Sequence, residues 1–250
     1  MSTPQAAIPS VTDTFDINNV KLKYPTIFRD GHIGMGVFTV NAIKAQALIA
    51  DSGFKIARIR PGRALMNIVC THYTDSDCGS YSEIALNFAV KTKGTINLPY
   101  ASTWAGLMSG KIPTYTWRLP VNSELAKQCG IEMWGFPKTL EDIHHENKGG
   151  YANWQWLSEG EEVLSFTIPS KGSRSPKAIE PPIYSLLNGI PVQSFLHQQY
   201  GNTGYHRNAK LHLGSHHIAD TLRSLGIKET PMMGVWSGKL FFEMSEPNEL

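Results

Sequence analysis

The chain has 250 residues, of which 18% are charged, and a formal net charge of +2 at pH 7. This length fits one large β-rich unit or two small domains. A net charge this small, with lysine and arginine scattered along the chain, excludes the basic patch that nucleic-acid or membrane-surface binding needs. Three cysteines at irregular spacing, Cys70, Cys78 and Cys129, form neither a disulfide framework nor a paired metal clip.

The first 20 residues are polar and contain proline, and they predict an N-terminal arm over residues 1–20. They lack the basic segment followed by an apolar segment that marks a signal peptide. The longest uncharged run, residues 94–110, contains Asn, Ser, Thr and Pro and is a poor membrane span. We therefore expect a cytoplasmic protein with no membrane or nucleic-acid partner.

Strand patterns dominate the first half of the chain. β-branched and apolar residues flanked by glycine or turn residues predict strands over 32–42, 54–60, 64–73, 81–92 and 111–120. Between the first two, residues 41–53 predict a short helix with Asn41 as N-cap and Gly53 after its end.

The strand over residues 81–92 alternates in part. One side carries Tyr81, Glu83, Ala85, Asn87 and Ala89, and the other is apolar, with Ile84, Leu86, Phe88 and Val90. Since successive side chains of a strand point to opposite faces, the two sets are expected on opposite sides of a sheet.

The second half begins with a helix signal over residues 122–130, with Ser123 as cap and Gly130 as stop. Residues 135–172 then read as three strands separated by turns at 147–150 and 158–162. Residues 183–201 have mixed character, 218–227 predict a short helix, and 233–244 predict a closing strand.

Helices in this reading are few and short, and no βαβ rhythm or internal repeat occurs. The pattern favours a mainly β (α+β) protein whose sheet is closed or strongly curled, with a few peripheral helices. We expect the N-terminal arm to be followed by one domain over residues 21–250.

Two motifs that suggest cofactors or metals have simpler explanations. The glycines at 31, 34 and 36 do not have GxGxxG spacing and favour a glycine-rich strand. The histidine pairs His144–His145 and His216–His217 lack an HExxH pattern and favour polar strand and turn positions. We therefore expect no metal and no cofactor. Trp154 and Trp156 share one strand face and favour a core or subunit contact.

Lys138 is the residue whose surroundings stand out. It follows Pro137, which restricts the backbone, and Trp134 and Phe136 lie just before it. In isolation a lysine after a loop proline is a solvent-exposed side chain. Burial, however, disfavours the charged form of a lysine. A neutral amine is a nucleophile that condenses with ketones, so these apolar neighbours favour Schiff-base chemistry at Lys138.

The stretch "GIEMWGFPKTL" resembles the lysine motif of the acetoacetate decarboxylase superfamily at Gly130, Glu132, Phe136, Pro137, Lys138 and Leu140. Upstream, "CGSYSEIAL" resembles the stretch that carries the family's active-site glutamate, here Glu83. The resemblance covers roughly residues 20 to 245. It implies a cone-like β-barrel, a homo-oligomer, and a small keto acid as substrate.

The resemblance also implies roles for particular residues. Lys138 forms the Schiff base with a 3-oxo acid, which then loses CO2, and Glu83 carries a proton. An ionised Glu83 close to Lys138 would favour the ammonium. Glu83 is therefore either protonated in the resting site or far enough away to act through substrate or water. Independently of the resemblance, the apolar side chains of Trp134 and Phe136 beside Lys138 are expected to exclude water from the amine and to line the substrate site.

The chain departs from the family pattern at three positions. The family's second lysine is Thr139 here, and the arginine of its Gly-Arg-Glu element is Ile131. The family's second acidic residue falls near Asn67, which forms hydrogen bonds but cannot move a proton. Arg29 is the nearest match to the family's substrate-binding arginine, with Arg118 as the other arginine able to orient a carboxylate.

Two alternatives stay open at the level of sequence. Loss of the second lysine fits a Schiff-base aldolase-dehydratase, in which the enamine of a 2-oxo acid attacks an aldehyde. The missing partner groups also fit a non-catalytic ligand-binding barrel.

Overall fold

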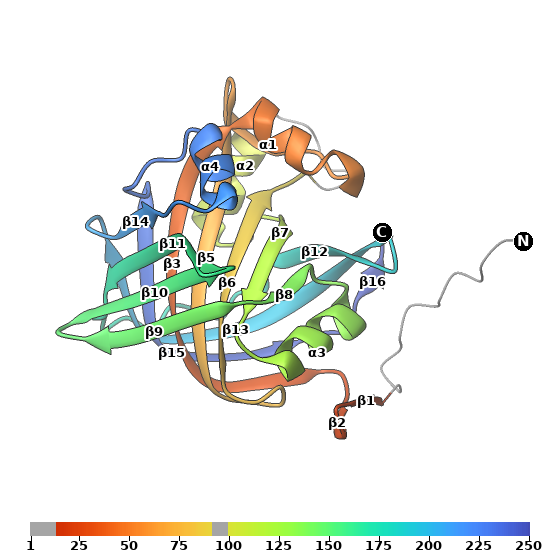
Figure 1. Cartoon of the computed structure of the whole chain (residues 1–250). Helices are drawn as coiled ribbons and strands as arrows, with labels where there is room; N and C mark the ends of the chain where they lie inside the picture. The colour runs from red at the N-terminus through yellow and green to blue at the C-terminus, as the bar shows by residue number, and fades with distance from the viewer. Residues whose placement is uncertain (1–13, 92–99) are drawn as a thin grey trace, which may run out of the picture.

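The computed structural model describes residues 14–91 and 100–250. Among these residues, seven strands follow one another around a strongly curled sheet (Figure 1). In spatial order they are β12 (Pro182–Leu187), β13 (Ile190–His206), β15 (Met233–Met244), β3 (Thr26–Asn41), β5 (Arg63–Ser76), β6 (Tyr81–Ala89) and β7 (Thr114–Val121). Strand β12 also pairs with β7 in parallel, which closes the sheet into a barrel.

Three short strands extend this sheet at its margins: β4 (Arg58–Arg60) on β5, β8 (Lys138–Leu140) on β7, and β16 (Asn248–Glu249) on β13. The pairing is antiparallel except between β7 and its neighbours β12 and β8. The prediction of a mainly β protein with a curled sheet is confirmed.

A second sheet packs against one outer side of the barrel (Figure 1). Its strands are β14 (Lys210–Leu213), β11 (Glu161–Pro169), β10 (Tyr151–Ser158) and β9 (Asp142–Lys148). Strands β9, β10 and β11 are those predicted over residues 135–172, and Gly149–Gly150 and Glu159–Gly160 occupy the turns between them. Trp154 and Trp156 are buried between the sheets, as a core position requires.

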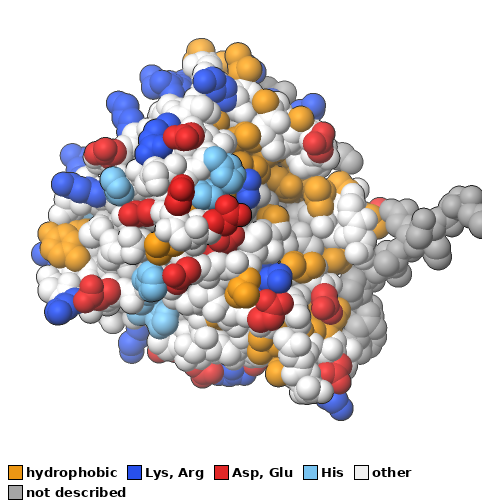
Figure 2. Space-filling model, viewed as in Figure 1, with side chains coloured by type: hydrophobic (Ala, Val, Ile, Leu, Met, Phe, Trp, Pro, Cys, Tyr) orange, Lys and Arg blue, Asp and Glu red, His pale blue; other side chains and the backbone are white. Residues whose placement is uncertain are grey.

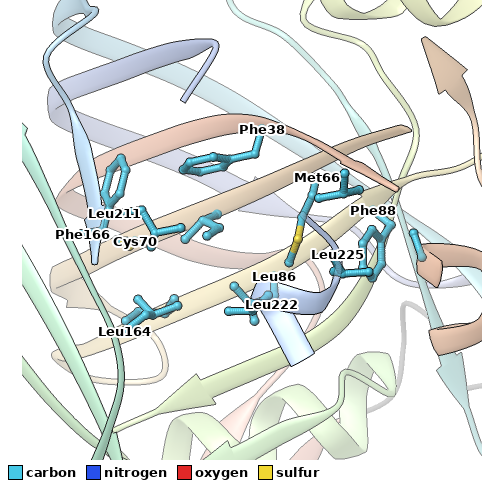
Figure 3. Close-up of a cluster of buried hydrophobic side chains, with 14 of the residues drawn as sticks. Phe38, Met66, Cys70, Leu86, Phe88, Leu164, Phe166, Leu211, Leu222 and Leu225 are labelled. Atoms are coloured by element: carbon cyan, nitrogen blue, oxygen red, sulfur yellow. The ribbon is translucent and has the colours of Figure 1, made fainter. Parts of the chain in front are cut away.

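Strands β3, β5 and β6 therefore have two buried faces. One face contributes Phe38, Met66, Cys70, Leu86 and Phe88 to the core beneath the second sheet (Figure 3). The other face points into the barrel. The glycine-rich start of β3 fits this double burial, because a Cβ at Gly34 would lie 2.9 Å from the ring of Trp154.

Helices lie at the edges of the sheets (Figure 1): α1 (Ala42–Leu48), the 3-10 turn η1 (Ala50–Ser52), α2 (Ala101–Ser109), α3 (Glu124–Trp134) and α4 (His217–Ser224). Asn41 caps α1 through its side chain, as predicted. Helix α2 was not predicted, because it lies in the uncharged run that has no apolar periodicity. No helix in the described part of the chain is long and apolar enough to cross a membrane.

Helix α3 differs from its prediction at the C-terminus. It continues through Gly130 to Trp134 and ends at Gly135, whose φ of +64° suits glycine. The amide of Phe136 donates to the Gly130 carbonyl and the amide of Gly135 to the Ile131 carbonyl, so amides at and after the helix end satisfy carbonyls of its last turns. The prediction that the helix stops at Gly130 was therefore wrong, because the residues that follow Gly130 are still helical as far as Trp134.

The predicted N-terminal arm is only partly covered, since residues 1–13 lie outside the described residues. Residues further along are packed, because β1 (Phe15–Ile17) and β2 (Val20–Leu22) form a hairpin that buries Ile17 and Leu22. The loose arm therefore does not extend to residue 20. A single domain over residues 21–250 stays a prediction.

Candidate active site

The barrel encloses a cavity of about 230 Å³. Its walls are mostly apolar, with side chains from β3, β5, β6, β7 and β15 and from the segment that ends α3. The fold thus provides a concave, apolar site of the kind that binds small molecules. By contrast, one outer face of the molecule carries acidic and basic side chains spread among one another (Figure 2).

Lys138 reaches this cavity from the first position of β8, which pairs with Leu119 of β7. Its side chain is 7% exposed, and its stem lies against α3 at Gly130. A Cβ on Gly130 would come within 2.4 Å of Lys138 Cδ, so the helix leaves space for the lysine only because this residue is glycine. Lys138 is therefore buried, unlike a typical lysine that follows a loop proline.

Glu83 lies directly beside the amine. Lys138 Nζ donates to Glu83 Oε2 at 3.3 Å, and the Glu83 side chain is 13% exposed. The hydroxyl of Tyr73 donates to the other carboxylate oxygen at 2.7 Å. The sequence left two arrangements open: a protonated Glu83 close to Lys138, or a distant Glu83. The distant arrangement is wrong, because the two side chains are hydrogen-bonded directly.

Two tyrosines and two cysteines complete the surroundings of the amine. The ammonium group lies 5.1 Å from the centre of the Tyr81 ring. Burial, followed by the charge of Glu83, raises the pKa of both Tyr73 and Tyr81, so both hydroxyls keep their protons. A hydrogen bond from Cys78 lowers the pKa of the Cys129 thiol. Thr139, at the position of the family's second lysine, is exposed on β8. This position therefore lies outside the cavity.

Trp134 and Phe136 also line the cavity, as the sequence predicted. Both are buried, and Trp134 is held by a hydrogen bond from its ring nitrogen to the Ser245 carbonyl. Asn67 lines the cavity too, but on a different level of the sheet. Thr71 is the cross-strand neighbour of Glu83. Asn67 lies four residues from Thr71 along β5, so the Cα atoms of Asn67 and Thr71 are about 13 Å apart.

Arg29 does not reach the cavity, and its assignment to substrate binding is corrected by the structure. Phe28 lines the cavity, so its neighbour on β3 points the other way. The guanidinium of Arg29 is 44% exposed and pairs with Asp77 and Asp75. Arg118 is also absent from the cavity wall, and its guanidinium lies 4.9 Å from the ring of Trp117. Among the described lining residues, Lys138 is the only lysine or arginine.

The sequence reasoning missed Tyr73, Cys78, Tyr81 and Cys129 as neighbours of the amine. A signal existed for Tyr81, because it shares the alternating face of Glu83. Tyr73 required knowledge that β5 pairs with β6. Across residues 14–91 and 100–250, no group of three or more His, Cys, Asp or Glu side chains is arranged to hold a metal ion.

Comparisons with known proteins agree with this geometry. A family profile described as acetoacetate decarboxylase (ADC) matches residues 3–241. No curated protein sequence matches the chain. Among solved structures, acetoacetate decarboxylase from Legionella pneumophila subsp. pneumophila str. Philadelphia 1 superposes with a TM-score of 0.66 at 15% identity, covering 90% of this chain and 87% of that one.

A second acetoacetate decarboxylase structure gives a TM-score of 0.64 at 15% identity and covers 92% of this chain and 90% of that one. The enduracididine biosynthesis enzyme MppR, complexed with pyruvate, gives 0.61 at 13% identity and covers 91% of each chain. At these identities the structural likeness describes the fold.

Proposed function

Because the chain belongs to the acetoacetate decarboxylase family, we propose that it is a carbon–carbon lyase that decarboxylates a 3-oxo acid through a Schiff base at Lys138. The observation that carries this proposal is the hydrogen-bonded pair of Lys138 and Glu83 at the wall of an apolar cavity. Family membership favours an enzyme over a non-catalytic ligand-binding barrel.

The first step is the release of the lysine nucleophile. Only an unprotonated amine can attack a carbonyl carbon, and Glu83 Oε2, at 3.3 Å from Nζ, is in position to accept the proton. Transfer of one proton from Lys138 to Glu83 converts the ion pair into an amine and a carboxylic acid, with no net charge left in the apolar cavity. Glu83 then holds the proton that later steps need.

The remaining steps follow from the amine. Nζ of Lys138 attacks the ketone carbon, and the proton held by Glu83 leaves with the carbinolamine hydroxyl as water, which gives an iminium ion and an ionised Glu83. The electron pair of the bond to the carboxylate moves toward the iminium nitrogen as CO2 leaves, which forms an enamine. Glu83 takes up a proton from solvent and passes it to the enamine carbon, and addition of water to the resulting iminium ion then releases the ketone product and the free lysine.

The absence of a second cation from the described cavity wall favours decarboxylation over the aldolase-dehydratase alternative. A 2-oxo acid keeps its carboxylate through the reaction and needs a lasting cationic partner, since a buried unpaired charge is costly. A 3-oxo acid loses its carboxylate as CO2, and until then the iminium ion is its partner. Pyruvate is the test compound for the alternative.

The Schiff base is tested by incubating the protein with acetoacetate or pyruvate, adding borohydride, and weighing the intact chain. We expect a covalent increment that maps to Lys138 and is absent from Lys138→Met. Lys127→Met is the matched control, because Lys127 lies on the outside of α3 in an exposed pair with Glu124. Turnover retained by Lys138→Met would sink the assignment.

Release of CO2 separates the two reactions, since only the decarboxylase produces it from acetoacetate. The homo-oligomer that the family resemblance implies and the cytoplasmic location expected from the sequence are further proposals. Light scattering of the purified protein tests the first, and fractionation of the source cell tests the second.

A further inference from the structure

The cavity has a second polar level, away from Lys138. Asn67 of β5, Asn87 of β6 and Thr116 of β7 are direct cross-strand neighbours and all line the cavity. They form one row across three adjacent strands. We call this row the distal polar row.

An apolar level separates the distal polar row from the reactive pair. Thr71 and Glu83 are cross-strand neighbours at the reactive level, and Val69 and Ala85 are neighbours at the next level along β5 and β6. Asn87 lies four residues from Glu83 on the same face of β6, which is about 13 Å between Cα atoms. The cavity is thus polar at two levels and apolar between them.

Two atoms of the distal polar row are unsatisfied. Asn87 is 5% exposed and Thr116 is 0% exposed, yet Asn87 Oδ1 and Thr116 Oγ1 have no hydrogen-bond partner among the described residues. Buried polar atoms without a partner cost free energy, so such atoms at a cavity wall indicate a ligand group that satisfies them.

The chemistry of the row limits the ligand group. An amide and a hydroxyl both donate and accept hydrogen bonds but carry no charge. A charged ligand group would be buried here without a counter-ion, at high cost. A hydroxyl group, which also donates and accepts, matches the row.

We propose that the distal polar row binds a hydroxyl group on the chain of the substrate, beyond the reacting carbonyl. A hydrogen bond takes up about 3 Å at the distal end and the covalent bond to Nζ about 1.5 Å at the reacting carbon, so roughly 8.5 Å remains of the 13 Å between the levels. An extended chain advances about 1.2 Å per bond, so it covers this span in roughly seven bonds. This inference rests on the proposed function and names its substrate class: a hydroxylated 3-oxo acid longer than acetoacetate.

The test is a binding measurement that needs no turnover. Two methyl ketones of roughly eight carbons, one with a terminal hydroxyl and one without, are titrated into the wild-type protein by calorimetry. We expect the hydroxylated ketone to bind about tenfold more tightly, which corresponds to about 1.4 kcal/mol. Equal affinities, as a buried water satisfying the row would produce, overturn the proposal.

Variants of the distal polar row test whether its side chains cause the tighter binding of the hydroxylated ketone. Thr116→Val and Asn87→Leu keep the approximate side-chain volume but remove the polar atoms, and we expect each to reduce the tenfold preference to less than about threefold. Their melting temperatures should stay equal or rise, because each removes an unsatisfied buried group. Ser194→Ala is the matched control, since Ser194 is buried and its hydroxyl is unpartnered within the described residues, but it does not line the cavity. A preference that persists in Thr116→Val and Asn87→Leu overturns the proposal.

Failure of this inference and failure of the proposed function give different results. If CO2 is released from 3-oxo acids but the two ketones bind equally, the distal polar row is not a subsite and the decarboxylase proposal stands. If the hydroxylated ketone binds more tightly but no 3-oxo acid releases CO2, the subsite stands and the reaction is different.

Discussion

At the scale of single residues, the reactive unit that we propose is a chain of three side chains rather than one lysine. Lys138 donates to one oxygen of Glu83, and Tyr73 donates to the other. With both oxygens engaged, the carboxylate has a fixed orientation toward the amine. We therefore expect Tyr73 to affect the reaction by positioning Glu83, without touching the substrate.

Replacing Tyr73 with phenylalanine tests this positioning role. Loss of the hydrogen bond leaves one carboxylate oxygen unpartnered, at a cost of about 1–3 kcal/mol, and frees the carboxylate to turn. We expect Tyr73→Phe to lower kcat by roughly tenfold or more, with little change in KM for a 3-oxo acid and a melting temperature lower by a few degrees.

Tyr184→Phe is the control for Tyr73→Phe. The Tyr184 hydroxyl also donates to a side-chain oxygen, that of Gln193 at 2.9 Å, but Tyr184 is outside the cavity wall. Its kcat should match the wild type. An equal loss of kcat in both variants would show that removing any buried tyrosine hydroxyl slows the reaction, contrary to a specific role.

At the scale of elements, the junction of α3 and β8 positions the amine. Gly135 ends the helix where a Cβ would approach the Leu186 carbonyl oxygen to 2.3 Å, so the chain passes close to β12 here. Phe136 then enters the cavity wall, and Lys138 begins β8 alongside β7. The helix also supplies Gly130, against which the lysine stem lies.

Gly130→Ala separates the position of the lysine from the stability of the helix. The added methyl group would meet Lys138 Cδ and Cε at 2.4 and 2.5 Å, so the flexible stem must move. Alanine stabilises a helix interior by about 0.5–1 kcal/mol relative to glycine. We therefore expect borohydride trapping to slow by tenfold or more while the melting temperature stays equal or rises by a few degrees.

A trapping rate equal to that of the wild type would contradict the positioning role of Gly130. Ala126→Gly on the same helix is the converse control. Ala126 is buried on α3 but does not line the cavity. That variant should lose stability and keep its trapping rate.

At the scale of the whole molecule, β3, β5 and β6 separate a packed hydrophobic core from a cavity. The core under the second sheet is filled by large aromatic and aliphatic side chains, including Trp154, Trp156 and Phe166. The barrel side keeps a cavity. Dense packing stabilises a protein and leaves no room for a ligand, so the two requirements are met on opposite faces of β3, β5 and β6.

A histidine cluster at the edge of the filled core makes stability depend on pH. His32 and His145 face each other with 2.5 Å between their Nε2 atoms, and His145 packs on the ring of Trp154. Burial lowers the pKa of each to about 4, helped by the charge of His72 on His32 and of His32 on His145. Asp30 acts on His32 in the opposite direction.

The sign of the pH effect follows from these lowered pKa values. Between about pH 6.5 and pH 4 the unfolded chain takes up protons at these rings while the folded chain does not, so the free energy of unfolding falls as the pH falls. We expect a loss of roughly 1–2 kcal/mol for each ring, discounted for its partial exposure. Thermal melts at pH 7 and pH 4.5 measure it.

His145→Gln provides the comparison, because glutamine does not titrate and thereby removes one of the two rings. Its melting temperature should fall less than that of the wild type between pH 7 and pH 4.5. Identical losses would mean that carboxylates elsewhere, rather than this cluster, set the acid sensitivity.

The sequence by itself determined the features that depend on local chemistry. Alternation along residues 81–92 separated the face of Tyr81 and Glu83 from the face of Leu86 and Phe88, because a strand has a period of two. Asn41 and Ser123 predicted the starts of two helices, since a side-chain oxygen there satisfies free amides. The apolar neighbours of Lys138 and the family motif predicted the lysine as the reactive group.

Only the tertiary structure decided which distant residues meet. The pairing of β5 with β6 brings Tyr73 to Glu83, and the pairing of β8 with β7 brings Lys138 to the same cavity. The tertiary structure also excluded Arg29 from the candidate site, because the face of β3 opposite Phe28 lies toward solvent and two aspartates. These outcomes depend on register between strands far apart in sequence. Register is set by the burial of whole faces, which a single stretch of residues does not encode.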